Sequence, residues 1–275
     1  MPGDLDPLYV VARQVLLDGL EALGKHKDSL VLVGAQAIYL HTGNADVAIA
    51  PYTTDADLTL DPQKLGPLPK LGELMNAAGF RPGKQPGIWV TMRNVGSRPH
   101  EVALDLLVPD SLGGGGRRGA RLPSHGNDVA RKAKGLEAVL VDNGAMDISA
   151  LDRADHRSVR VLVAGPSALL VAKLHKLGER EDAAPERLKP KDAHDVLRLL
   201  RSISTDTFAA GFEKLRGDAL SAAVTIEAIE YLRNLFSLAD ALGPELAARA
   251  VAGLEPADVI KESCAVLAND LLRRL

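Results

Sequence analysis

Apolar residues recur along the chain with two spacings, the three-to-four-residue spacing typical of helices and the two-residue alternation typical of strands. The first third of the chain changes repeatedly from one spacing to the other. The predicted elements are a helix over residues 6–24, a strand over 29–33, a helix from Gly34 to about Gly43, a strand over 55–61 and a helix over 65–78.

The rest of the chain divides into a strand-rich part and a helical part. Two strands, 87–93 and 101–109, flank the turn-rich stretch NVGSRP and predict a hairpin. The stretch SLGGGGRRGARLPSHG follows, and its four consecutive glycines predict a mobile loop. Strands are expected again at 137–142 and 158–163. From Pro166 onward the predicted elements are helices over 166–179, 189–202, 205–216, 219–241, 243–253 and 256–274.

This order of elements predicts an α+β fold in two domains. Residues 1–165 are expected to form a small mixed sheet flanked by helices, and residues 166–275 an all-helical domain. With 275 residues, of which 46% are hydrophobic and only 3% aromatic, the core is expected to consist of Leu, Val and Ala.

Composition narrows the class of protein. Cys264 is the single cysteine, which excludes an intrachain disulfide and suits a reducing cytoplasm. The N-terminus is acidic and then amphipathic, unlike a signal peptide. No apolar run approaches the ~20 residues that span a bilayer, so no membrane partner is expected. We therefore expect a cytoplasmic protein.

Charge is unevenly distributed in a chain whose net charge is −3. Six basic residues lie between Gly113 and Lys134, beginning with Arg117, Arg118 and Arg121, against a single acid, Asp128. Two interpretations remain open for this stretch: a flexible linker, or a basic arm that contacts nucleic-acid phosphates.

Carboxylates interrupt the strand pattern at 55–61. Alternation places Asp55, Asp57 and Asp61 on one face and apolar residues on the other, with neighbouring carboxylates ~7 Å apart along the strand. Such like charges repel unless a cation lies between them. Asp105 adds a further carboxylate in the apolar run ALDLLVP, where an unpaired charge is costly. If the two strands are neighbours, Asp55, Asp57 and Asp105 converge, and we expect them to bind a hard divalent cation such as Mg²⁺.

Two further features suit anionic ligands. In LVLVGAQAIYLHTG a strand runs into a helix at Gly34, where free backbone N–H groups form an anion site. Farther on, Lys173 lies on one helix face with Lys176 and Arg180. The next predicted helix carries Lys191, Asp192 and Asp195 in the pattern KDxxD.

Taken in order, these pieces resemble a known family. VGAQA, TTDADLTL, ALDLLVP, LLVAKLHKLGER and KDAHDVLRLL together resemble the AbiEii/MenT-type nucleotidyltransferases, which belong to the DNA-polymerase-β-like superfamily and many of which are the toxin of a toxin–antitoxin pair. The resemblance covers residues 25–200. It implies the minimal nucleotidyltransferase fold in the first domain, and an enzyme that transfers NMP from an NTP to an acceptor hydroxyl and releases pyrophosphate.

The resemblance also implies a role for each matching residue. Gly34 and Ala35 would hold phosphates, and Asp55 and Asp57 would bind Mg²⁺, with Mn²⁺ as the alternative. Asp105 would be a third metal ligand or the base that takes the proton of the attacking hydroxyl. The remaining roles fall to the helical domain, where Lys173 would stabilise the triphosphate, Asp195 would position Lys173 or the nucleotide, and Lys191 and Asp192 would lie at the nucleotide.

Two departures from the family pattern concern phosphate binding. Ala35 stands where the family usually has Ser or Gly, which removes a possible hydroxyl contact with phosphate. The stretch from Gly34 to Asp55 is also longer than is usual in the superfamily, so HTGNADVAIAPYT must loop out. Neither departure removes a carboxylate.

Three functions remain open at this point. The first is transfer of NMP to RNA, in particular to the 3′ end of tRNA, with Arg117, Arg118 and Arg121 as RNA contacts and an antitoxin as a partner. The second keeps the chemistry but uses an aminoglycoside-like small molecule or a protein as acceptor. The third is a degenerate, non-catalytic binding module. The sequence contains neither the P-loop pattern GxxxxGK[ST] nor the zinc motif HExxH. His175 and His194, which lie beside Lys173 and Asp195 in the sequence, are expected to cap or line the site.

Overall fold

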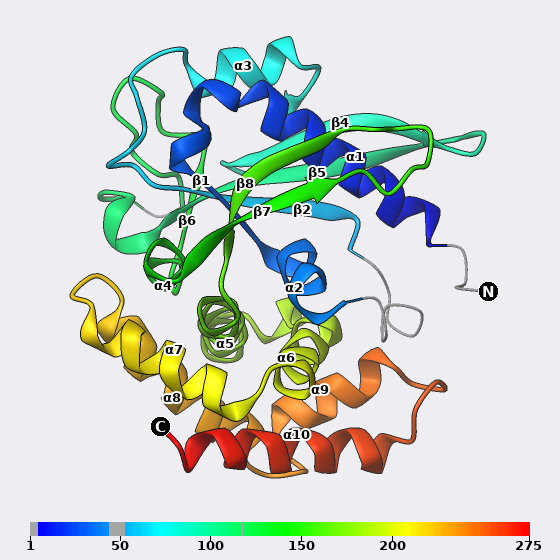
Figure 1. Cartoon of the computed structure of the whole chain (residues 1–275), viewed down its shortest axis with the longest axis vertical. Coiled ribbons are helices and arrows are strands. Elements are labelled where there is room, and N and C mark those ends of the chain that lie inside the picture. The colour runs from blue at the N-terminus through cyan, green and yellow to red at the C-terminus, as the bar shows by residue number, and fades with distance from the viewer. Residues whose placement is uncertain (1–4, 44–52, 117) are drawn as a thin grey trace. The chain divides into compact units, whose positions relative to one another are not determined.

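The computed structural model describes residues 5–43, 53–116 and 118–275 (Figure 1). The chain divides into two compact units. The first unit comprises Met1–Ala37, Tyr52–Ala133 and Asn143–Ala164, and the second comprises Ile38–Pro51, Lys134–Asp142 and Gly165–Leu275. The division therefore falls close to residue 165, but it also groups two earlier segments with the C-terminal helices.

The first unit is built on a mixed sheet, which has eight strands in the described part of the chain. Its strands are β1 (Leu30–Val33), β2 (Asp55–Leu60), β3 (Arg81–Pro82), β4 (Ile88–Val95), β5 (Arg98–Pro109), β6 (Arg131–Ala133), β7 (Asn143–Ser149) and β8 (Ser158–Ala164). They are ordered β3-β4-β5-β2-β1-β8-β7, and β6 pairs with β5. At the centre, β2 runs antiparallel to β1 and parallel to β5.

Helix α1 (Pro7–Ala22) packs across one face of this sheet, against β5, β2 and β4 (Figure 1). Asp6 caps its N-terminus by accepting a hydrogen bond from the Leu8 N–H (2.8 Å), as helix N-termini require. The close approach depends on Gly19, because a Cβ atom there would overlap the buried side chain of Leu104 in β5. The α1 face of the sheet is therefore the apolar face that carries Leu104.

Shorter elements complete the first unit. They are the 3₁₀ turns η1 (Gly24–Ser29) and η2 (Asp110–Leu112), the helix α3 (Leu71–Ala77) and the start of α2 (Gly34–Thr42), which the division between the units cuts after Ala37.

The second unit is helical. Its helices are α4 (Glu137–Val141), α5 (Pro166–Ala183), the 3₁₀ turn η3 (Pro185–Arg187), α6 (Pro190–Ser202), α7 (Thr205–Gly217), α8 (Ala222–Phe236), α9 (Leu242–Ala250) and α10 (Ala257–Leu272). Helix α5 packs against α6, α7 and α8 through fully buried leucines such as Leu170 and Leu174. The Asp142 carboxylate accepts a hydrogen bond from the Ala168 N–H at the start of α5 (3.2 Å), a favourable place for a negative charge.

The predicted α+β class is confirmed, with three local corrections. Residues 137–142, predicted as a strand, form α4 instead, and the strand β7 begins just after them. The helix predicted over 65–78 begins only at Leu71, because prolines at 67 and 69 break the preceding turn. The glycine-rich stretch is predicted to be mobile, yet Ala120 and Leu122 are buried and the Ala120 N–H donates to the Ala130 carbonyl (2.9 Å). Among the described residues, no helix is long and apolar enough to cross a membrane.

We predict that Gly19→Val lowers the free energy of unfolding by ~1–3 kcal/mol, because the added side chain overpacks the α1–sheet contact at Leu104. Gly24→Ala is the matched control, since no atom lies near the position of its new Cβ. Urea unfolding of both variants checks the prediction. Equal stability of Gly19→Val and wild type would contradict the packing described for α1.

Candidate active site

The predicted carboxylates meet on two neighbouring strands of the first unit. Asp57 of β2 lies directly opposite Asp105 of β5, and Asp55 lies opposite Ala103. Residues opposite one another on paired strands share a face and are ~4.8 Å apart. Because Leu104 belongs to the α1 face, Asp55, Asp57 and Asp105 lie on the other face. Asp61 is separate from them: it follows β2, accepts from the Gln63 N–H (3.0 Å) and pairs with Lys64 (3.3 Å).

Gly34 lies against the Asp57 carboxylate. It directly follows β1, whose last residue, Val33, is paired with Asp57, and it begins α2 with φ +72°. A Cβ atom at position 34 would overlap the Asp57 carboxylate, so both the backbone conformation and the contact require glycine. The carboxylate thereby lies at the first turn of a helix, whose dipole favours negative charge. Ala35, the next residue, is buried.

Arg131 is the partner of Asp105. It lies in β6, which pairs in parallel with β5 so that Arg131 is opposite Leu107, two residues beyond Asp105 on the same face. Its Nη2 donates to Asp105 Oδ2 in an ion pair. The expectation that Asp105 needs a partner is thus met by a residue that the sequence pattern does not single out. In the sequence, Arg131 is only one of six basic residues in its stretch.

Asp55 has a different neighbour. The Thr53 hydroxyl donates a hydrogen bond to Asp55 Oδ1, and the Gln36 side chain of α2 donates to the Asp55 backbone carbonyl (3.2 Å). Gln36 also accepts from the buried Arg13 Nε (2.8 Å). These bonds connect the start of β2 to α2 and α1 within the first unit, which fixes the strand that carries Asp55 and Asp57.

The donor chemistry of Asp55 and Asp57 fits Mg²⁺, which proteins commonly hold with one or two carboxylates together with substrate phosphates. Across residues 5–43, 53–116 and 118–275, no three His, Cys, Asp or Glu side chains form a group that could hold a metal ion by themselves. Asp105 instead contacts the Arg131 guanidinium. The residues therefore fit a cation shared with phosphate oxygens, held by Asp55 and Asp57.

The predicted Lys173 cluster lies in the second unit. Lys173 of α5 is buried, and its Nζ donates to Asp192 Oδ1 (2.8 Å) and Asp195 Oδ2 (2.7 Å) of α6. Lys176 Nζ and Arg180 Nη1 also reach the two oxygens of Asp192, both at 2.9 Å. Asp192 is therefore shared by three cations that are spaced along one face of α5.

Electrostatics keep this cluster charged. Burial of Lys173 opposes its positive charge, but the neighbouring Asp192 and Asp195 carboxylates outweigh burial and raise the pKa of Lys173 above its usual value. Burial of Asp192 likewise opposes its charge, yet Lys173 and Lys176 hold the pKa of Asp192 well below 3.8. A buried ion pair of this kind is costly to break, because removal of one partner leaves an uncompensated charge.

The other predicted residues of the second unit lie on the same two helices. Lys191 is half-buried at the start of α6. His175 is buried in α5, where its Nε2 lies 2.7 Å from the Val224 carbonyl. Burial lowers the pKa of both His175 and His194.

The basic stretch is partly anchored to the sheet. Arg118 and Arg121 are exposed; Arg118 Nη1 donates to Gln85 (3.1 Å), and the Arg118 carbonyl accepts from the Lys132 N–H of β6 (2.8 Å). Arg117 lies outside the described residues. The exposed arginines therefore flank the strand that carries Arg131.

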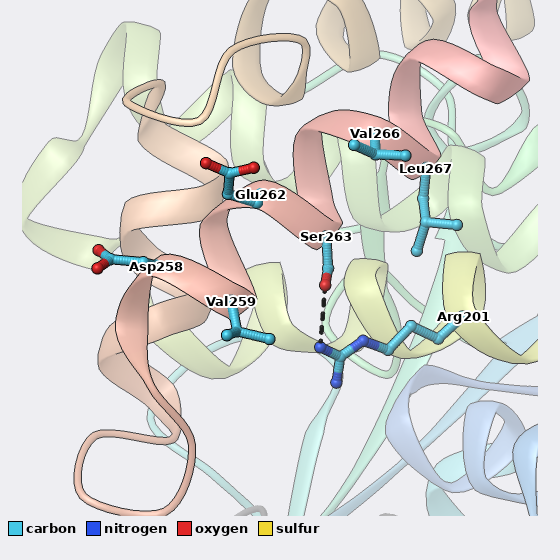
Figure 2. Close-up of a pocket in the computed structure, with 7 residues that line it drawn as sticks. All are labelled: Arg201, Asp258, Val259, Glu262, Ser263, Val266 and Leu267. Atoms are coloured by element: carbon cyan, nitrogen blue, oxygen red, sulfur yellow. Dashed lines mark hydrogen bonds between the residues drawn. The ribbon is translucent and has the colours of Figure 1, made fainter.

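A cavity of 590 Å³ lies elsewhere, between α6 and α10 of the second unit (Figure 2). Its lining includes Val259, Val266 and Arg201, whose guanidinium donates to the Ser263 hydroxyl (3.3 Å). None of the predicted site residues lines this cavity. Its mainly apolar lining does not resemble a phosphate site.

A nucleotidyltransferase family model matches residues 13–215. The chain belongs to this nucleotidyltransferase family. No curated protein matches the sequence. A crystal structure of a candidate nucleotidyltransferase from H. pylori is similar over 97% of this chain and 96% of that one, at 10% identity and a TM-score of 0.38. The family match covers the candidate site residues of both units, whereas the narrower AbiEii/MenT-type resemblance stays a prediction.

We predict that Asp192→Asn lowers the free energy of unfolding of the nucleotidyltransferase by ~3–5 kcal/mol at pH 7, since it leaves the buried Lys173 with one carboxylate. Folding lowers the pKa of Asp192, so its contribution is present above the unfolded value of 3.8 and is lost as the pH falls below it. The difference between wild type and variant should therefore shrink below pH ~4.

Urea unfolding at pH 7, 5 and 3 measures this difference. Lys176→Met is the matched control, because it removes an exposed partner of the same carboxylate and should cost less than ~1 kcal/mol. An equal loss in the free energy of unfolding in the two variants would contradict the claim that the buried Lys173 is the main partner of Asp192.

Proposed function

We propose that this nucleotidyltransferase uses Mg²⁺, or Mn²⁺ in its place, to transfer NMP from an NTP to the terminal hydroxyl of an RNA. The 3′ end of tRNA is the proposed acceptor. We further propose that the enzyme is the toxin of a toxin–antitoxin pair, held inactive by a cognate antitoxin. The acceptor and the toxin role follow from the resemblance to the AbiEii/MenT-type enzymes, and the family match supports the chemistry.

One observation carries the metal-dependent part of the proposal: Asp57 lies at once opposite Asp105 and against Gly34. Nucleotidyl transfer needs a place where a triphosphate, a divalent cation and an attacking hydroxyl meet. Carboxylates supply the cation ligands, and the first turn of α2 supplies N–H groups that suit phosphate. The register of β1, β2 and β5 brings these groups together in the first unit.

The proposed reaction is an in-line displacement. The acceptor oxygen attacks the α-phosphorus and loses its proton, a new P–O bond forms, and the bond to the leaving pyrophosphate breaks. A bound divalent cation would neutralise the charge that develops on the phosphate oxygens. The contribution of the chain is to position the reactants and to hold carboxylates at fixed places, so that little reorganisation is needed during the reaction.

The Lys173 cluster supports a positioning role for Asp195 and Asp192. The resemblance assigns Lys173 to the triphosphate, and a lysine serves there only if its long side chain is held in one place. Two ion pairs below 3 Å hold its Nζ. Asp195 is therefore proposed as a residue that positions Lys173, with Asp192 as a second one that also orients Lys176.

RNA as acceptor is supported by the basic stretch. Exposed Arg118 and Arg121 flank β6, the strand whose Arg131 reaches Asp105. Phosphate contacts by arginine give affinity without reading sequence, which suits an enzyme that recognises the end of a folded RNA by its backbone. Arg117 is proposed as a third contact from its position in the sequence alone.

We predict that Asp57→Asn reduces the rate of NMP transfer by at least ~100-fold without unfolding the protein, because it removes a charge from the proposed cation site. Asp61→Asn is the matched control: it removes an acid from the same DxDxxxD run, but from a turn outside the site. Release of pyrophosphate with each of the four NTPs and total RNA measures both variants. Full activity of Asp57→Asn would refute the proposed site.

We also predict that the double variant Arg118→Met/Arg121→Met raises the KM for RNA several-fold, with the KM for NTP unchanged. The salt dependence of RNA binding should weaken by a slope of about 1–2, one unit for each arginine that no longer binds a phosphate. Arg98→Met, an exposed arginine at the other end of the β4–β5 hairpin, is the control. If label from α-labelled NTP enters a protein or a small molecule and not RNA, the proposed acceptor is wrong.

A further inference from the structure

The ion pair between Arg131 and Asp105 places a cation of the chain at the carboxylate face. The Asp105 side chain is 10% exposed and that of Arg131 is 27% exposed, so bulk water screens the pair only partly. The register of β5 with both β2 and β6 directs Arg131 toward the same face as Asp57 and Asp105. The guanidinium therefore contacts Asp105 Oδ2, an oxygen that could otherwise be a ligand of a divalent cation.

The hydrogen bonding of Arg131 is incomplete in this arrangement. Its Nε is buried and, among the residues that the structure describes, has no hydrogen-bond partner. A buried donor without a partner is costly, and such groups are uncommon in folded proteins. Strand β6 is also short, with three residues, and it pairs with the last residues of β5. The pair with Asp105 thus leaves the guanidinium with an unsatisfied donor that another position or a phosphate oxygen could satisfy.

We infer that Arg131 is a resident counter-cation that competes with divalent metal for Asp105. With Arg131 on Asp105, the site holds metal through Asp55 and Asp57 alone. When Arg131 leaves, Asp105 Oδ2 becomes available as a further oxygen ligand. Arg131 thereby sets the metal affinity of the free enzyme, and it keeps the three carboxylates from holding a cation tightly before the nucleotide arrives. This inference rests on the metal dependence in the proposed function and does not depend on which acceptor is used.

Binding of Mn²⁺ to the nucleotide-free protein tests the inference, with free Mn²⁺ followed by electron paramagnetic resonance at constant ionic strength. We expect Arg131→Met to bind Mn²⁺ roughly tenfold more tightly than wild type, since a unit charge beside a partly buried ligand has been removed. Arg131→Lys keeps the charge and should stay close to wild type, and it also serves if Arg131→Met does not fold.

Two further variants separate competition at Asp105 from a general charge effect. Lys132→Met removes the same charge from the next residue of β6, which points to the other face and pairs with Asp110 (3.1 Å), and should change the Kd less than about twofold. In the double variant Arg131→Met/Asp105→Asn, the gain in Mn²⁺ affinity should be abolished.

Each other outcome overturns the inference. Equal gains in Arg131→Met and Lys132→Met would mean that net charge alone sets the affinity. A gain that survives Asp105→Asn would mean that Asp105 is not the ligand released. If Arg131→Met binds Mn²⁺ with the same Kd as wild type, the proposed role of Arg131 is refuted, while the proposed metal site stands. Absence of Mn²⁺ binding in all variants would refute both.

Discussion

Mutual repulsion between carboxylates is the constraint around which the first unit is arranged. Asp57 and Asp105 lie opposite one another on hydrogen-bonded strands, with Asp55 two residues away on the same face. Water cannot fully screen the repulsion between charges this close together. Neighbouring positive groups of the fold therefore reduce it. Asp57 lies at the first turn of α2, which only glycine at position 34 permits, and Asp105 pairs with Arg131. The sheet thus keeps three acids together at a cost that these neighbours reduce, and a bound divalent cation would reduce it further.

In the second unit the constraint has the opposite sign, because a cation, Lys173, is buried there. Burial of an unpaired Lys173 ammonium between α5 and α6 would cost free energy. Two carboxylate oxygens that lie less than 3 Å from its Nζ keep the side chain charged. Asp192 binds Lys176 and Arg180 as well, which locks one face of α5 onto α6. Nearby, the fully buried Arg198 of α6 stacks on Tyr39 (4.6 Å) and donates to Thr42 (2.9 Å) at the end of α2. In each unit, ion pairs therefore hold residues that the sequence analysis singled out, Asp105 in the first unit and Lys173 in the second.

The sequence predicts the candidate site residues whose spacing within a single strand or helix places them on one face. The alternation of Asp55 and Asp57 gave their common face, and the spacing of Lys173, Lys176 and Arg180 gave theirs. It missed Arg131, because the parallel pairing of β6 with β5 joins segments separated by a glycine-rich stretch that has no strand periodicity. It also misassigned 137–142, where a short apolar run suits strand and helix equally. There Gly135, with φ +85° and its N–H donating to Glu137 (2.9 Å), begins a helical turn that no sequence period indicates.

The central claim is that the carboxylate face of β2 and β5 is the metal and nucleotide site of this nucleotidyltransferase. A crystal grown with Mn²⁺ and a non-hydrolysable NTP analogue, with anomalous scattering measured at the manganese edge, tests it most directly. We predict an anomalous peak against the Asp55 and Asp57 carboxylates, with the triphosphate at the first turn of α2 and the Arg131 guanidinium moved off Asp105. A nucleotide bound elsewhere, with no manganese at these carboxylates and the Arg131–Asp105 pair intact, would contradict it.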